Sequence, residues 1–211
     1  VRVFSLPWPW DGERFALPEP APITFLTGPL GSGKTRLARR IAEVLPGAAF
    51  LGLERAGAEG AAAAEARPAA DPARAARARR ALDWLAGDGA RPTPALGALL
   101  AALLEGTGPL VVDLVEEGLD AATQGALMAY LRGRPEGARA LYLMTRSTAI
   151  LDLEAVGAGE EILLCPANHS PPVWVRPYPG TPGYEAVATA LAPPAVRARS
   201  AGVVAVQAPA G

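Results

Sequence analysis

The stretch that most constrains this chain is Gly28-Pro29-Leu30-Gly31-Ser32-Gly33-Lys34-Thr35. It matches the pattern G-x-x-x-x-G-K-[ST] at every fixed position. The apolar run 23–27 before it has the composition of a buried strand, and residues 36–45 after it carry apolar side chains at helical spacing. A strand, a glycine-rich loop and a helix in this order form the setting that a phosphate-binding loop requires.

Each fixed residue type in this stretch has a physical reason. Glycines allow backbone N–H groups to converge on phosphate oxygens, and a helix N-terminus adds positive potential. Lys34 is placed to neutralise the β and γ phosphates, and the Thr35 hydroxyl is placed to ligate Mg²⁺. Lys34 is also the only lysine, because the other nineteen of the 20 basic residues are arginines. The pattern predicts a site for ATP and Mg²⁺ made by Gly28, Gly31, Ser32, Gly33, Lys34, Thr35 and Arg36.

Length and charge narrow the class of protein. The chain has 211 residues, of which 50% are apolar, enough for one domain with a substantial core. The net charge of −1 gives no indication of nucleic acid or an anionic membrane as a partner. The single cysteine, Cys165, fits a reducing compartment. No run approaches the ~20 apolar residues of a transmembrane helix, and the first residues lack a signal-peptide pattern. These features predict a cytoplasmic protein.

Strand-like and helix-like segments alternate along the chain, which predicts an α/β fold with a mostly parallel sheet sandwiched by helices. Two short alternating runs around Asp11-Gly12 add an antiparallel β pair at the N-terminus. We expect a nucleotide-binding domain over 1–175 and a Pro-rich extension over 176–211 that packs on it and frays at its end. Residues 56–72 fit either a loop or a helix. Strands are expected at 23–27, 48–53, 109–113, 140–145, 161–165 and 173–175, and helices at 36–45, 73–86, 95–105, 121–131 and 184–191.

Three further features each allow two interpretations. Asp113 closes the apolar run 109–113, where it would orient the Mg²⁺ shell or simply cap the next segment of the chain. Trp8 and Trp10 would cover the edge of the core or supply a ring that stacks on the base, for which Trp10 is the candidate. The arginines at 74–80 form either a solvated helix face or a surface for nucleic acid or a protein partner.

Residues 109–120 resemble the second nucleotide motif and following loop of ABC-type ATPases, above all the branch with RecF, SMC-like and overcoming-lysogeny-defect ATPases. Residues 140–151, with Thr145-Arg146-Ser147, resemble the strand and Thr-His-Ser switch of that family. The N-terminal β pair and the strand end at Glu54-Arg55 are also similar. The resemblance covers most of residues 1–165. It implies a P-loop NTPase fold, ATP hydrolysis, and an ATP site completed by a partner subunit or a second copy.

The chain departs from the family at the positions that hydrolysis needs. Leu114 stands where a glutamate polarises the attacking water, and Arg146 stands where the switch histidine is usual. No glutamine lies between Thr35 and Asp113 to serve as the lid on Mg²⁺. Residues 91–97 do not resemble the Leu-Ser-Gly-Gly signature, so a homodimer would lack the standard composite site.

The catalytic candidates are therefore Lys34, Glu116 and Arg146. Glu116 matches the second glutamate of the family loop, or is an ordinary loop carboxylate; Arg146 would contact the γ-phosphate, or is a strand-end side chain. Three functions remain open: a slow or partner-activated ATPase within a larger assembly, a nucleotide-dependent regulatory subunit that does not hydrolyse, and a small-molecule kinase whose lid would come from residues 73–80.

Overall fold

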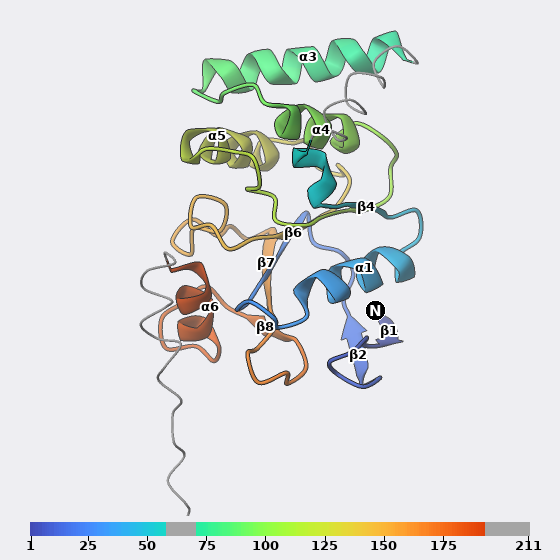
Figure 1. The fold of residues 1–211 in the computed structure, drawn as a ribbon, viewed down its shortest axis with the longest axis vertical. Helices are drawn as coiled ribbons and strands as arrows, with labels where there is room; N and C mark the ends of the chain where they lie inside the picture. Colours follow the sequence, from blue (N-terminus) through green and yellow to red (C-terminus); the bar gives the residue numbers. More distant parts are fainter. Residues whose placement is uncertain (58–70, 193–211) are drawn as a thin grey trace, which may run out of the picture.

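The computed structural model describes residues 1–57 and 71–192, which form an α/β fold (Figure 1). A six-stranded sheet has the order β4-β5-β6-β3-β7-β8, and a separate two-stranded sheet pairs β1 with β2. The strands are β1 (Arg2–Ser5), β2 (Arg14–Leu17), β3 (Ile23–Thr27), β4 (Ala49–Leu51), β5 (Leu110–Val112), β6 (Leu141–Met144), β7 (Glu160–Leu164) and β8 (Val173–Val175). The helices are α1 (Lys34–Val44), the 3-10 helix η1 (Leu53–Ala56), α3 (Pro72–Gly87), α4 (Pro94–Leu103), α5 (Ala121–Arg132) and α6 (Tyr184–Leu191).

The large sheet is parallel except at one edge, as the sequence predicts. Strand β3 runs parallel to both β6 and β7, and Phe25 pairs with Leu143 on one side and Ile162 on the other. Of the described strands in this sheet, β8 alone is antiparallel, beside β7. All five residues of β3 are buried, which is typical of a parallel strand covered on both faces. Because parallel strands end at the same edge, the loops after β3, β5 and β6 lie together.

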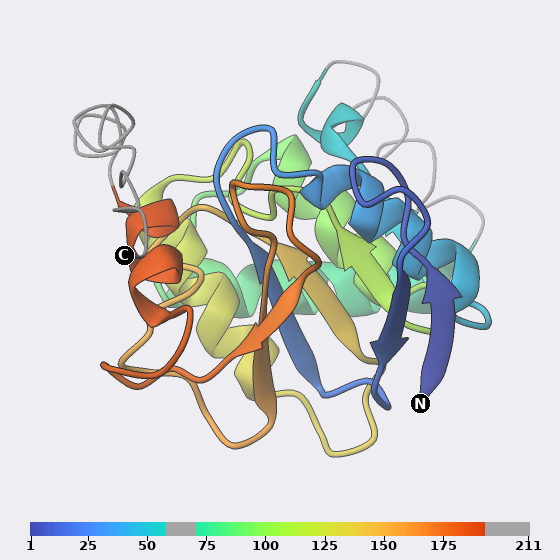
Figure 2. The same ribbon diagram turned by 90° about the horizontal axis from the view of Figure 1, so that it is seen from below.

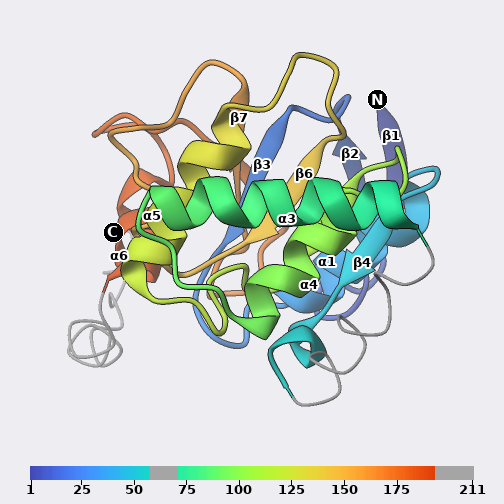
Figure 3. The same ribbon diagram turned by 90° about the horizontal axis from the view of Figure 1, so that it is seen from above.

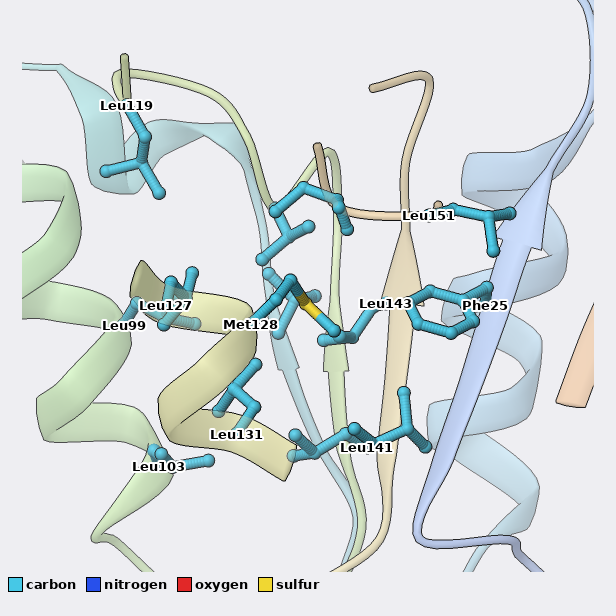
Figure 4. Packing of buried hydrophobic residues seen from close by; sticks show 14 of the residues in the cluster. Phe25, Leu99, Leu103, Leu119, Leu127, Met128, Leu131, Leu141, Leu143 and Leu151 are labelled. Atoms are coloured by element: carbon cyan, nitrogen blue, oxygen red, sulfur yellow. The ribbon is translucent and has the colours of Figure 1, made fainter. Parts of the chain in front are cut away.

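Helices cover both faces of this sheet. On one face, α1 and the β1–β2 pair bury a core that includes Phe4, Leu37 and Leu163 (Figure 2). On the other face, α4, α5 and α6 pack on the sheet, and α3 lies outermost across α4 and α5 (Figure 3). Met128 of α5 points toward Leu143 of β6 in this second core (Figure 4). The chain thus forms layers around one sheet, with the antiparallel N-terminal pair packed on one face and not hydrogen-bonded to that sheet.

The helices begin where local hydrogen bonding favours them. Asp71, Thr93 and Asp120 cap α3, α4 and α5, each accepting a backbone N–H three residues further on. Pro72 and Pro94 occupy the first turn of α3 and α4, where a missing N–H costs nothing. None of the described helices combines the length and the apolar character that crossing a bilayer would need.

The strand expected at 48–53 differs most from its prediction. Strand β4 ends at Leu51, and Glu54-Arg55 lies in the 3-10 helix η1 instead of at a strand end. The turn buries the Arg55 side chain, which then bonds to backbone carbonyls beside β4 and β5. In the extension after 175, α6 buries Val187 and Leu191 in the second core. Residues 58–70 and 193–211 lie outside the described part, and with them most of the 56–72 segment and the expected frayed end.

Candidate functional site

The glycine loop between β3 and α1 contains three glycines with positive φ. Gly28, Gly31 and Gly33 adopt φ of 144°, 79° and 89°, all in the region that disfavours side chains. A Cβ on Gly28 would lie 2.3 Å from the carbonyl oxygen of Cys165. A Cβ on Gly33 would lie 2.7 Å from the indole of Trp10. The loop is therefore held between the end of β7 and the N-terminal segment, with no space for larger residues at either point.

Lys34 opens α1 and lies across its own loop. The side chain is only 8% exposed. Its Nζ donates to the Pro29 carbonyl at 2.5 Å and lies 3.3 Å from the Ser32 hydroxyl. An ammonium at the N-terminus of a helix, where the N–H groups of the first turn have no partner within the helix, is an arrangement suited to a polyphosphate.

Asp113 follows β5 and is close to Thr35 at the start of α1. Asp113 is 3% exposed, and its Oδ1 has no hydrogen-bond partner among the described residues. Burial raises the pKa of Asp113, while the Thr35 hydroxyl and the Arg55 guanidinium oppose that shift by stabilising the anion. Because an unpartnered buried carboxylate is costly, this oxygen fits a site that a cation completes.

The residues present fit a Mg²⁺ ion that is bound partly by phosphate and water better than a metal ion that is bound by protein side chains alone. No group of three or more His, Cys, Asp or Glu side chains able to hold a metal gathers in residues 1–57 and 71–192. Mg²⁺ keeps several waters and uses one or two protein ligands together with phosphate oxygens. The exposed Thr35 hydroxyl and the Asp113 carboxylate would be those ligands.

A cavity of about 290 Å³ lies over the loop. Leu114 faces this cavity with an apolar side chain and has a φ of 39°. Arg146 lines the cavity from the end of β6, the strand between β3 and β5. Asp113 is not among the residues that line the cavity. The cavity is lined by Trp8, Leu30, Gly31, Gly33, Lys34, Thr35, Arg36, Leu114, Met144 and Arg146.

Glu116 is directed at the protein backbone. Its Oε1 accepts a hydrogen bond from the Arg146 backbone N–H at 2.8 Å, and its Oε2 is buried without a partner among the described residues. Glu116 is absent from the cavity lining. In this conformation Glu116 therefore bonds to the Arg146 backbone, and no carboxylate from residues 1–57 or 71–192 lines the cavity over the glycine loop.

The two tryptophans occupy different environments. Trp10 is 2% exposed, donates its indole N–H to the Ser170 carbonyl at 2.8 Å, and packs beneath Gly33, so it supports the loop from below. Trp8 is 59% exposed, lines the cavity, and has the Arg36 guanidinium 4.3 Å from its ring centroid. Of the pair, Trp8 is thus the ring that a base could reach, and Trp10 has the core-covering role that the sequence left open.

Sequence reasoning passed over some residues that lie at the loop. His169, in the loop after β7, places Nε2 3.3 Å from the Gly31 carbonyl oxygen. Met144 lines the cavity, with its sulfur 4.0 Å from the Thr35 hydroxyl. The position of Met144 at the end of an apolar strand is a sequence signal that it could lie at this edge of the sheet. No local sequence signal places His169 beside the glycine loop.

A larger cavity of about 550 Å³ lies elsewhere, between β2 and the β7–β8 edge, where Trp174 and Glu161 line it. It contains no residue of the glycine loop, so we place the candidate site at the smaller cavity. A scan against protein-family models and a search of curated proteins found no match to this chain.

Proposed function

We propose that this chain binds ATP with Mg²⁺ and is a slow or partner-activated ATPase of the ABC/RecF-like kind, acting as a subunit of a larger assembly. The observation that carries the proposal is the meeting of Lys34, Thr35 and Asp113 at one edge of a parallel sheet. A buried carboxylate with an unpartnered oxygen, beside an exposed threonine hydroxyl and a lysine at a helix N-terminus, has the chemistry that a metal–nucleotide complex needs.

Slow hydrolysis is expected from the residues that line the cavity. Leu114 cannot accept a proton, and the Glu116 carboxylate is engaged with the Arg146 backbone. Phosphoryl transfer depends on positioning and electrostatic stabilisation more than on a strong base. Arg146 offers a cation at the end of β6, between the loop and Asp113, where it would stabilise charge on the γ-phosphate. A partner that supplies or releases a carboxylate would then raise the rate.

A non-hydrolysing regulatory subunit is the second candidate, and Leu114 at the cavity wall favours it. The kinase interpretation has less support. It requires an arginine lid from residues 73–80, but these lie in α3, on the opposite side of the sheet from α1 (Figure 1). No residue of α3 lines the cavity.

The test is to measure binding of ATP and GTP, and phosphate release, for the wild type and for Lys34→Ala. We expect Lys34→Ala to weaken ATP binding about tenfold or more, since a charge-assisted hydrogen bond contributes about 1.5–3 kcal/mol. Arg40→Ala is the control, because it removes a positive charge from the same helix at a residue that pairs with Glu43 and is absent from the cavity lining.

The outcomes separate the candidates. Unchanged ATP binding by Lys34→Ala would refute the nucleotide site. Tight binding without phosphate release, alone and with co-purifying proteins, would exclude the ATPase and leave the regulatory subunit. Consumption of ATP that requires a small acceptor molecule would favour the small-molecule kinase instead.

A further inference from the structure

A buried arginine joins the ends of two strands behind the proposed metal site. Arg55, in η1, is 2% exposed. Its guanidinium donates to the carbonyl oxygens of Gly52 at 2.8 Å and Asp113 at 2.7 Å through one nitrogen, and to that of Leu114 through the other. The planar, forked guanidinium can serve several acceptors at once, which a lysine ammonium on a flexible stem does less well.

These bonds begin where the strand pairing stops. The β4–β5 ladder ends at the pair Leu51–Val112, with the Asp113 N–H donating to the Leu51 carbonyl. The next two residues in line, Gly52 and Asp113, direct their carbonyl oxygens to the same guanidinium nitrogen of Arg55. Arg55 thus connects the segments that follow β4 and β5, one residue beyond the end of their pairing. One of the two connected residues is Asp113, which carries the carboxylate.

The turn that Arg55 holds has an uncommon backbone. Leu114 has a φ of 39°, a region in which a leucine is rare because its Cβ crowds the following carbonyl. Its carbonyl is fixed from two sides, by Arg55 and by the Glu117 N–H at 2.9 Å. Such a conformation persists only when its surroundings determine it, and Arg55 provides part of that constraint.

The charge of Arg55 also bears on the site. Burial lowers the pKa of the guanidinium, and the carboxylates of Asp113, Glu116, Glu117 and Glu54 oppose that shift. The Arg55 guanidinium therefore acts on Asp113 through its charge as well as through the hydrogen bond to the Asp113 carbonyl.

We propose that Arg55 is a positioning residue of the Mg²⁺–nucleotide site, which fixes the Asp113–Leu114 turn so that the carboxylate remains beside Thr35. This inference rests on the proposed function. It predicts that the glycine loop and Lys34 determine the affinity for ATP without Mg²⁺. Arg55 should affect only the additional affinity that Mg²⁺ provides.

The test compares ATP binding in Mg²⁺ with ATP binding in EDTA, for the wild type, Arg55→Lys and Arg55→Met. We expect binding in EDTA to stay within about twofold of the wild type, and the Mg²⁺ enhancement to fall about tenfold in both variants. Arg134→Lys is the matched control, because Arg134 also donates to three backbone carbonyls, at Leu131, Arg139 and Pro22, away from the site. It should lower the melting temperature and leave the enhancement unchanged.

A second substitution tests the turn itself and covers the case in which Arg55→Met does not fold. Leu114→Gly makes a positive φ inexpensive, so adding it to Arg55→Lys should recover part of the lost Mg²⁺ enhancement. Folded Arg55 variants that keep the wild-type enhancement, or an Arg55→Lys defect that Leu114→Gly leaves unchanged, would overturn the inference. A wild type that does not bind ATP would instead refute the proposed function.

Discussion

Substitution of Gly28 by alanine tests the close approach on which the loop geometry depends. The added Cβ would lie 2.3 Å from the Cys165 carbonyl oxygen and 3.0 Å from the Ser32 hydroxyl, at a φ of 144°. Cys165 cannot retreat easily, because its N–H donates to the Thr27 carbonyl at 2.9 Å at the end of the β3–β7 ladder. An unfavourable backbone region costs about 1–3 kcal/mol and overpacking costs about 1–3 kcal/mol more. We expect Gly28→Ala to lose about 2–6 kcal/mol of stability.

Gly31→Ala is the matched comparison in the same loop. Gly31 has a φ of 79°, but no atom lies within 4 Å of an added Cβ. Only the backbone cost applies, about 1–2 kcal/mol. Urea unfolding, followed by tryptophan fluorescence and circular dichroism, measures both variants. If Gly28→Ala loses no more stability than Gly31→Ala, the loop does not pack against Cys165 as described.

Two further predictions concern buried polar groups. Because burial raises the pKa of Asp113 above 3.8, its ionised form destabilises the fold. This cost is absent below pH 3.8, grows between pH 3.8 and the raised pKa of the folded state, and is complete above that pKa. At pH 8, Asp113→Asn should therefore raise the free energy of unfolding of the nucleotide-free protein by about 1 kcal/mol and its melting temperature by about 2–4 °C. The rise should be smaller toward pH 4. An equal rise at both pH values would show that burial of the ionised carboxylate is not the cause. Arg139 donates to the carbonyls of Ala102, Gly108 and Pro109 at 2.8, 2.7 and 3.1 Å, and to that of Glu105, so Arg139→Met should lower the urea-unfolding free energy by about 1–3 kcal/mol. A loss below about 0.5 kcal/mol would show that water replaces these bonds.

Much of the local structure could be predicted from the chain alone. The expected helices and strands are present within the described residues, with bounds shifted by a few positions. Helix caps such as Asp71 and Asp120 accept backbone N–H groups three residues away, so both partners lie within one short stretch of sequence. The loop glycines at 28–33 are similarly local, because the conformations that they allow depend on the absence of a Cβ.

The arrangement of the candidate site could not be predicted in the same way. Which tryptophan faces the cavity depends on packing against Gly33 and Ser170, far away in sequence. The engagement of Glu116 with the Arg146 backbone depends on β6 lying between β3 and β5, and apolar runs do not encode the order of strands. The displacement of Arg55 from a strand end into a buried turn has the same cause, since its acceptors Gly52 and Asp113 directly follow the neighbouring strands β4 and β5.

By itself the sequence determined the glycine loop, its lysine and threonine, and the alternation of strands and helices, because each rests on contacts within a few residues. Only the tertiary structure decided that Asp113 lies beside Thr35 and that Leu114 lines the cavity. It also decided that Arg55 donates to the carbonyls of the Asp113–Leu114 turn. Those contacts join residues about sixty to eighty positions apart, and burial of apolar surface by the whole sheet brings them together.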